Sequence, residues 1–432
     1  MKQSAPDSSD LPVWAKADAF PAAPPGWGWV DHKGRENPCA SLEKLGATIR
    51  DDREGSVTLV WAPGHERMMP PEELAGMGDA LRTARARWNA EDLEIATRRM
   101  RWFGGILGFF SLYVFLGGFM LASRLAAQSG TEIDVGQRLQ FAWRAVTNST
   151  QCGIALLMFV MFAFIPWYQA RKRAREFSKW TDAGMAEAAP TIRFETWLQR
   201  QKAPFTRIIL GMITLVALAQ IFGEVKTCGL GSLWSLLHAW GGVSEAGLVK
   251  ERYFQGEWWR IFTAPLLHGN VLHFLMNAAA LAYLGKRLEV FARWPHLPMV
   301  FLFSAILGGE ASARLVAAPS VGASGGLMGW LGFLLVFETL HQRLVPRPAR
   351  RRLIAGVVLT AVIGLIGYRF IDNAAHAGGL IAGMVYAAIV FPASASPHRP
   401  QPNLTDRIMG GSALAVLTAT TLFAAWKIFT SG

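Results

Sequence analysis

The chain has 432 residues, of which 52% are hydrophobic and only 17% are charged, and its mean hydropathy is +0.25. Because a soluble domain carries about 25% charged residues, this composition excludes a disordered chain and argues against a wholly soluble enzyme. The net charge of +12 comes largely from basic residues between long apolar runs. That pattern is typical of membrane-protein loops, so we expect no nucleic-acid partner.

Residues 1–100 are predicted to form a small α+β region. The first thirty residues hold neither the apolar stretch of a signal peptide nor the basic, acid-poor composition of a transit peptide. Residues 47–63 are typical of a strand, a polar turn and a second strand. The run from Pro70 to Glu73 is expected to open a helix toward Arg101. Five tryptophans are expected to form a small core rather than a peptide-binding surface: Trp14, Trp27, Trp29, Trp61 and Trp88.

Nine apolar runs follow, which we interpret as membrane spans. They cover residues 102–122, 152–168, 208–222, 271–288, 297–317, 322–340, 353–367, 373–391 and 408–428. A long amphipathic segment at 223–269 carries no full span. The sequence therefore predicts an all-α polytopic membrane protein.

The distribution of basic residues sets the expected orientation. With the N-terminus inside, the inner segments carry 25 Lys and Arg residues and the outer segments carry 10. Because cytoplasmic loops are enriched in basic residues, we expect a cytoplasmic N-terminus and an outer C-terminus. The host membrane is expected to be the inner (cell) membrane of a bacterium.

Four polar residues lie within or at the ends of these spans, where polar groups are costly and mark functional sites. His273 and Asn277 are four residues apart and share one helix face. Ser324 and His376 each lie near the predicted outer start of a span. All four are therefore expected at one depth, in the outer half of the membrane.

This set of residues suits acyl-transfer chemistry. A serine hydroxyl needs an adjacent base, which His376 could supply to Ser324. The Ser324 N–H, the Asn277 amide and a His273 ring N–H could stabilise an oxyanion. Gly379 and Gly383 form a small-residue stripe that could pack His376 against the span of Ser324.

Each residue also has a simpler interpretation. An isolated intramembrane serine more often bonds its own helix backbone, and an isolated histidine is more often a packing residue. Residues 322–326 fit the GxSxG nucleophile elbow, but their apolar helical context offers no strand–turn–helix. His65 and Glu66 lack the second histidine of a metalloprotease motif. We expect no cofactor and no metal ion.

Three motifs resemble the rhomboid family. Residues 256–277 read GEWWRIFTAPLLHGNVLHFLMN, with a Trp-Arg pair, a histidine and then HxxxN. The GASGG around Ser324 is similar to the rhomboid GxSG, and AHAGGLIAG at 375–383 is similar to its AHxxGxxxG. The resemblance covers about residues 208–391.

The resemblance implies a six-span intramembrane serine protease that cleaves transmembrane segments near the outer face. It implies Ser324 as nucleophile, His376 as base, and His273, Asn277 and the Ser324 amide as oxyanion donors. Segment 223–269 would be a membrane-dipping loop. Met328 stands where the family often has an aromatic residue that packs on the base, and Asp372 is expected to face the outer interface. The supporting positions are His268, Trp259, Arg260, Gly322 and Gly379.

We therefore predict a rhomboid-like core of six spans with two extra spans before it and one after it. The expected domains are residues 1–100 (cytosolic), 101–170 (two spans), 171–207 (linker), 208–393 (protease core) and 394–432 (linker and last span). The expected partners are transmembrane substrates and the lipid bilayer. The alternatives are a non-proteolytic rhomboid-like protein that binds membrane clients, and a small-solute transporter. No internal repeat supports the transporter, and Glu310 is expected to cap or pack within its span.

Overall fold

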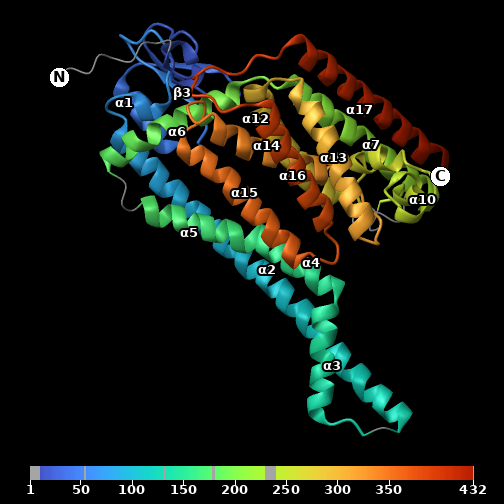
Figure 1. Cartoon of the computed structure of the whole chain (residues 1–432). Helices are drawn as coiled ribbons and strands as arrows, with labels where there is room; N and C mark the ends of the chain where they lie inside the picture. The colour runs from blue at the N-terminus through green and yellow to red at the C-terminus, as the bar shows by residue number, and fades with distance from the viewer. Residues whose placement is uncertain (1–9, 53–54, 131, 178–180, 229–239, 432) are drawn as a thin grey trace. The chain divides into compact units, whose positions relative to one another are not determined.

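The computed structural model describes residues 10–52, 55–130, 132–177, 181–228 and 240–431 (Figure 1). They form two compact units. The N-terminal unit comprises Phe20–Arg193 and Leu359–Ile371. The core unit comprises Met1–Ala19, Phe194–Val358 and Asp372–Gly432. Part of the expected membrane-dipping loop, residues 229–239, lies outside the described residues.

A small antiparallel sheet opens the N-terminal unit. Its strands are β1 (Trp27–Val30), β2 (Glu36–Cys39) and β3 (Leu59–Trp61), in the order β2-β1-β3. Trp27 pairs with Cys39, and Val30 pairs with Leu59. Gly28 faces the indole ring of Trp61, and the ring occupies the space that a Cβ at position 28 would fill. Glycine is therefore required at this position of β1.

The first strand predicted for residues 47–63 is wrong, whereas the second is confirmed as β3. The chain forms helix α1 (Leu42–Asp51) instead, and the Ser41 hydroxyl caps it by accepting from the Lys44 N–H at 3.2 Å. Leu45 and Ile49 are four residues apart and both are buried, so they share one helix face. The cap and this apolar stripe outweigh the β-propensity of the β-branched residues.

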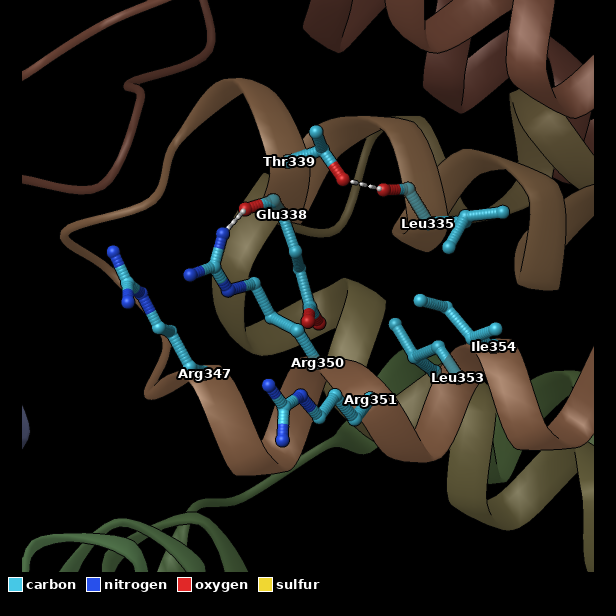
Figure 2. A pocket seen from close by; sticks show the side chains of 8 residues that line it. All are labelled: Leu335, Glu338, Thr339, Arg347, Arg350, Arg351, Leu353 and Ile354. Carbon is cyan, nitrogen blue, oxygen red and sulfur yellow. Dashed lines mark hydrogen bonds between the residues drawn. The ribbon is translucent and has the colours of Figure 1, made fainter.

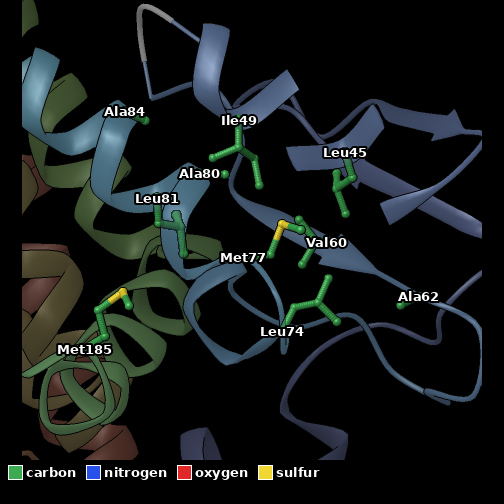
Figure 3. Close-up of a cluster of buried hydrophobic side chains, with 10 residues drawn as sticks. All are labelled: Leu45, Ile49, Val60, Ala62, Leu74, Met77, Ala80, Leu81, Ala84 and Met185. Carbon is green, nitrogen blue, oxygen red and sulfur yellow. The ribbon is translucent and has the colours of Figure 1, made fainter. Parts of the chain in front are cut away.

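The core of the N-terminal unit joins the sheet, α1 and the start of α2 (Figure 3). Trp27, Trp29 and Trp88 pack against this cluster, and Trp61 is 1% exposed. Trp14 is the exception, because it belongs to the core unit and donates its indole N–H to the Leu344 carbonyl at 2.8 Å. Four of the five tryptophans therefore contribute to the small core that the sequence predicts. The buried cluster comprises Leu45, Ile49, Val60, Ala62, Leu74, Met77, Ala80, Leu81, Ala84 and Met185.

One helix continues from this small core into the first apolar run. The proline-rich segment forms only the 3₁₀ turn η4 (Pro71–Glu73), so the helix predicted to open there begins later, as α2 (Gly78–Ser129). It has 52 residues and ends at Gly130, whose φ of 65° is the left-handed conformation that glycine adopts at helix ends. α5 runs alongside α2 (Figure 1). The later helices are α3 (Val135–Asn148), α4 (Thr150–Phe159), the π-helical turn η5 (Val160–Phe164), α5 (Ile165–Phe177) and α6 (Asp182–Arg200).

The core unit is a helical bundle in which α14 packs against α13, α16 and α12 (Figure 1). Before its long helices come the short turns η2 (Val13–Ala15) and η3 (Ala17–Ala19). The segment before α12 holds α9 (Val243–Ala246), α10 (Lys250–Phe254), α11 (Arg260–Thr263) and η7 (Ala264–Leu266). The long helices are α7 (Pro204–Cys228), α12 (Val271–Ala292), α13 (His296–Leu315), α14 (Ser324–Leu340), α15 (Arg347–Ile366), α16 (Asn373–Val390) and α17 (Leu404–Ser431).

Six helices of the described residues are long and apolar enough to cross a membrane. They correspond to the predicted runs at 102–122, 152–168, 208–222, 297–317, 373–391 and 408–428. The other three runs are also helical, as α12, α14 and α15. The chain is therefore a multi-pass integral membrane protein, and the count of nine spans stays a prediction.

Buried acids link helices of the core unit. Glu289 of α12 accepts hydrogen bonds from the N–H groups of Phe205 and Thr206, at the positive N-terminus of α7. Arg287 of α12 donates to both carboxylate oxygens of Glu338 on α14, at 2.5 and 2.9 Å. The last two side chains are almost fully buried. These contacts fix how α12 sits against its neighbours.

Candidate active site

Close contact between α14 and α16 brings two of the predicted site residues together. A Cβ on Gly379 would lie well inside 3.0 Å of the Gly325 carbonyl oxygen, and one on Gly383 would meet the Gly329 carbonyl in the same way. Both helices therefore run in the same direction with the same register. Ser324 directly precedes Gly325, and His376 lies one helical turn before Gly379. The glycine stripe predicted to join these spans is confirmed.

Ser324 is the first residue of α14 and is half-buried. The chain reaches it through Gly322, whose φ of 122° suits glycine and strains other residues. The Gly322 N–H donates to the Ala264 carbonyl at 2.9 Å, and Ser320 forms two backbone hydrogen bonds with Leu248. The turn before Ser324 is therefore fixed against the α9–η7 segment.

His273 and Asn277 converge on this turn from α12. A Cβ on Gly322 would lie 2.6 Å from His273 Cε1, 2.7 Å from His273 Nε2 and 3.5 Å from Asn277 Nδ2. The Asn277 Nδ2 atom is buried and has no hydrogen-bond partner in the part of the chain that the structure describes. The Gly269 N–H donates to His273 Nδ1 at 3.5 Å, which leaves the ring proton on Nε2. Two nitrogen donors therefore lie beside the backbone that leads to Ser324.

His376 completes the group without yet bonding to the serine. It lies within electrostatic range of His273. Its Nδ1 atom is buried, and no described residue forms a hydrogen bond with it. Among the described residues, no hydrogen bond joins the Ser324 hydroxyl to the His376 ring. Catalytic hydrogen bonds are often loose before a substrate is bound.

Asp372 turns inward and contacts neighbouring helices. Its Oδ1 atom caps α16 by accepting from the Ala375 N–H at 2.9 Å, and its Oδ2 atom accepts from the Ser312 hydroxyl on α13. It is half-buried. These two bonds hold the carboxylate against the bundle, and its place at the outer interface stays a prediction. Among the described residues, no hydrogen bond joins its carboxylate to the His376 ring.

The supporting residues lie around this site. His268 is fully buried, and its backbone N–H and carbonyl both bond to the Gln220 side chain of α7 at 2.9 Å. Its ring packs edge-on against His273, with centroids 5.3 Å apart. Met328 is buried within α14.

Arg260 and Trp259 hold the loop segment beside the site. Arg260 is 1% exposed, donates to the Gly247 carbonyl at 2.7 Å, and pairs with Glu257 at 2.5 Å. Gly247 precedes Leu248, the residue paired with Ser320. The Arg260 guanidinium lies over the Trp259 ring, which contacts Phe423 of α17 edge-on. The predicted supporting pair thus stabilises the backbone that positions the turn before Ser324.

A cavity of about 200 Å³ lies at the other end of α14 (Figure 2). Three arginines of α15 line one side of it, and apolar side chains line the other. Arg350 donates to the Glu338 carbonyl at 3.4 Å. The lining begins eleven residues beyond Ser324, so this cavity is separate from the candidate active site. It is lined by Leu335, Glu338, Thr339, Arg347, Arg350, Arg351, Leu353 and Ile354.

The structure also places three residues at the site that sequence reasoning missed, namely Lys250, Ser312 and Gln220. All three are buried polar residues. Ser312 and Gln220 lie on apolar helices, where an isolated polar residue indicates a candidate functional position. Lys250 lies in the amphipathic segment, where a lysine carries no such signal.

The fold and this cluster define a multi-pass membrane protein with a polar site at the start of α14. Residues 255–393 match the rhomboid domain. The chain therefore contains a rhomboid domain, as the three motifs predict, and that domain holds all four residues of the predicted site.

Curated relatives align over the same part of the chain. It is 34% identical to Rhomboid protease GluP of Bacillus subtilis (strain 168) over 147 residues, which cover 34% of this chain and 28% of that protein. It is 33% identical to RHOMBOID-like protein 6, mitochondrial, of Arabidopsis thaliana over 138 residues, which cover 31% of this chain and 44% of that protein. It is 30% identical to Inactive rhomboid protein 1 of Bos taurus over 139 residues, which cover 32% of this chain and 16% of that protein. The chain spans less than half the length of each relative.

Proposed function

We propose that this chain is an intramembrane serine endopeptidase that cleaves transmembrane segments of other membrane proteins. The observation that carries the proposal is the meeting of four polar residues at one end of α14. Glycine contacts bring the helix of His376 against that of Ser324, and Gly322 lies against His273 and Asn277. Polar groups in membrane helices are costly, and this arrangement gives each of them a role. Similarity to a protein named a rhomboid protease supports the same function.

In this mechanism Ser324 and His376 act as a dyad. The Ser324 oxygen attacks the carbonyl carbon of the scissile peptide bond while His376 accepts the hydroxyl proton. The oxyanion accepts hydrogen bonds from the Ser324 N–H, Asn277 Nδ2 and His273 Nε2. His376 then returns the proton to the leaving amine, and an acyl-enzyme forms. Water repeats the attack, with His376 again as base, and releases the new carboxyl end.

The substrate class follows from where this chemistry takes place. A transmembrane helix satisfies its backbone hydrogen bonds internally, so its carbonyl carbons are shielded until the helix unwinds. Substrates should therefore carry glycine or other helix-destabilising residues near the cleavage point. Under the charge-based orientation, the site and the cleavage lie near the outer face.

The alternative is a rhomboid-like protein that binds membrane clients without cleaving them. Similarity to a protein named an inactive rhomboid favours it, as does the lack of a Ser324–His376 hydrogen bond among the described residues. However, a binding protein has no need for a serine, a histidine and an unpartnered amide at one point. Proteolysis requires all three groups.

A cleavage assay tests the two functions against each other. Purified protein is mixed in liposomes with a model transmembrane substrate that carries a glycine pair in its outer half. Wild type should release a fragment, whereas Ser324→Ala and His376→Ala should release none and should elute as wild type does in size-exclusion chromatography. Full cleavage by Ser324→Ala would overturn the mechanism. Substrate binding without cleavage by wild type would favour the client-binding function.

A further inference from the structure

A buried lysine of the α9–η7 segment is linked to the helix that carries His376. Lys250, the first residue of α10, is 7% exposed, and its Nζ atom donates to the Ser312 hydroxyl at 2.8 Å. Ser312 on α13 is fully buried and donates in turn to Asp372 Oδ2. The hydrogen bonds therefore form one directed path from α10 through α13 to the start of α16.

Asp372 uses its two carboxylate oxygens for different purposes. One accepts from Ser312, and the other accepts from the Ala375 N–H and caps the first turn of α16. His376 is the next residue, and its own N–H donates to the Asp372 carbonyl at 3.1 Å. The side chain and the backbone of Asp372 therefore both hold the helical turn from which the His376 ring projects.

The turn before Ser324 reaches the same carboxylate. Ser320 interacts with Asp372 through its hydroxyl and pairs with Leu248 through its backbone. Leu248 is two residues before Lys250, and Ser320 is four residues before Ser324. Asp372 thus connects the backbone that leads to the serine with the helix that carries the histidine.

The charges in this network are complementary. Burial lowers the pKa of Lys250 to about 8, while the negative charge of Asp372 opposes that shift. Burial alone would raise the pKa of Asp372, but hydrogen bonds from Ser312, from Ser320 and from the Ala375 N–H, together with the charge of Lys250, bring it below its ordinary value. At neutral pH the two groups therefore form an ion pair bridged by a serine hydroxyl. Removing one partner of such a pair leaves the other charge buried and uncompensated.

We propose that Asp372 is a positioning residue for His376, and that Lys250 holds Asp372 in place through Ser312. This inference rests on the proposed function, because its consequence for rate depends on His376 acting as the base. Asp372 acts through the backbone of α16, which its side chain and its carbonyl hold, since no hydrogen bond among the described residues joins its carboxylate to the His376 ring. The α9–η7 segment is thereby coupled to the catalytic geometry. A misplacement of about 1 Å in such a site can cost about a hundredfold in rate.

A double-mutant cycle tests the proposal. Asp372→Asn keeps the helix cap, because asparagine caps helices as well as aspartate does, but it removes the charge. Lys250→Met removes the other end of the network. Each variant should lower kcat at least tenfold with little change in KM. The double variant should be no slower than the slower single variant, because the two changes break one interaction.

Glu310→Gln is the matched control. Glu310 lies on α13, as Ser312 does, and accepts from the Tyr253 hydroxyl of α10. It therefore also links α10 to α13, but its described contacts do not reach α16. This variant should change kcat by less than about threefold. In the double variant with Asp372→Asn, the two factors in kcat should simply multiply, because the two sites are independent. Independent effects of Lys250→Met and Asp372→Asn would overturn the proposal.

A second measurement keeps the test independent of catalysis. Hydrogen exchange of the detergent-purified full chain reports the opening of the first turn of α16. Lys250→Met should speed exchange in a peptide covering residues 372–380, although the changed residue is far away in sequence, whereas Glu310→Gln should not. Unchanged exchange in Lys250→Met would overturn the positioning role whether or not the protein cleaves peptides. Faster exchange in Lys250→Met, together with a wild type that cleaves no substrate, would contradict only the proposed function.

Discussion

Gly379 of α16 lies against the backbone carbonyl of Gly325 on α14, so closely that no side chain fits between them. The contact repeats one turn later between Gly383 and Gly329. Because a backbone carbonyl cannot rotate away as a side chain can, this pair fixes both the distance and the register of the two helices. The positions of Ser324 and His376 relative to each other depend on it.

Gly379→Ala should therefore disturb the site without touching either member of the dyad. The added methyl group must push α16 away from α14, and overpacking of this kind costs about 1–3 kcal/mol. We expect a lower melting temperature and at least a tenfold loss of cleavage. Gly411→Ala on α17 is the control, because a Cβ there meets nothing within 4 Å. A Gly379→Ala variant with wild-type activity would show that the contact does not set the geometry.

Much of the candidate site could be predicted from the sequence because membranes penalise polar groups. His273, Asn277, Ser324 and His376 are conspicuous within apolar runs, and a spacing of four residues places the first two on one face. Glycines at 379 and 383 likewise predict a close helix contact, because only small residues let helix backbones approach. The structure brings all four residues to the start of α14.

The network around Asp372 could not be predicted, because it joins elements that are distant in the sequence. Lys250 and Ser312 are 62 residues apart, and Ser312 and Asp372 are 60 apart. No local pattern reports such pairs. The hydrogen bond that ties Asp372 to α13 comes from Ser312, a residue that the sequence around Asp372 does not indicate.

Local sequence patterns also gave two wrong predictions of secondary structure in the N-terminal region. The β-branched residues near Ile49 favour a strand, but burial against α2 and the Ser41 cap make this segment a helix. The prolines at 70 and 71 form a 3₁₀ turn, and α2 begins at Gly78. Both errors lie where tertiary packing outweighs local preference.

Asn277→Ala should slow the chemical step while leaving substrate binding intact. Its Nδ2 atom has no hydrogen-bond partner among the described residues, so we expect its hydrogen bond to form with the oxyanion. In other enzymes the loss of one oxyanion donor lowers kcat by about a hundred- to a thousandfold. For Asn277→Ala we expect kcat to decrease by about ten- to a thousandfold, because two other donors remain. Initial rates over a range of substrate concentrations separate kcat from KM. A rise in KM alone would assign Asn277 to substrate binding instead.

The ion pair between Arg287 and Glu338 should behave differently as single and double changes. Arg287→Met leaves a buried carboxylate unpaired, and breaking such a pair costs about 3–5 kcal/mol. The double variant Arg287→Met, Glu338→Leu removes both charges and should recover most of the lost stability. Melting temperatures in detergent measure this. Equal destabilisation by the single and double variants would show that the pair contributes through packing alone.

The pH dependence of activity should show the titration of Lys250. Its pKa in the folded protein is about 8, below the ordinary 10.5, so its charge is present below pH 8 and is lost above it. The attraction to Asp372, the charged group that faces it, disappears with that charge. We expect kcat to fall as pH rises through about 8, and this decline should be absent in Lys250→Met.

Stability should not follow the same course. Between pH 8 and 10.5 the unfolded chain holds the lysine proton more tightly than the folded chain does, so this group makes folding more favourable as pH rises. Activity should therefore decline without a matching decrease in melting temperature from this group. A flat rate profile from pH 7 to pH 9.5 would contradict the role given to Lys250.

The proposed mechanism depends most directly on the activation of Ser324 by His376. Detergent-purified wild type, Ser324→Ala and His376→Ala are treated with a fluorescent fluorophosphonate, which reacts with activated serines. If His376 activates Ser324, wild type should be labelled and neither variant should be, with all three proteins equally folded by size-exclusion chromatography. Labelling of Ser324→Ala at the wild-type level, or of His376→Ala at the wild-type rate, would contradict the Ser324–His376 dyad.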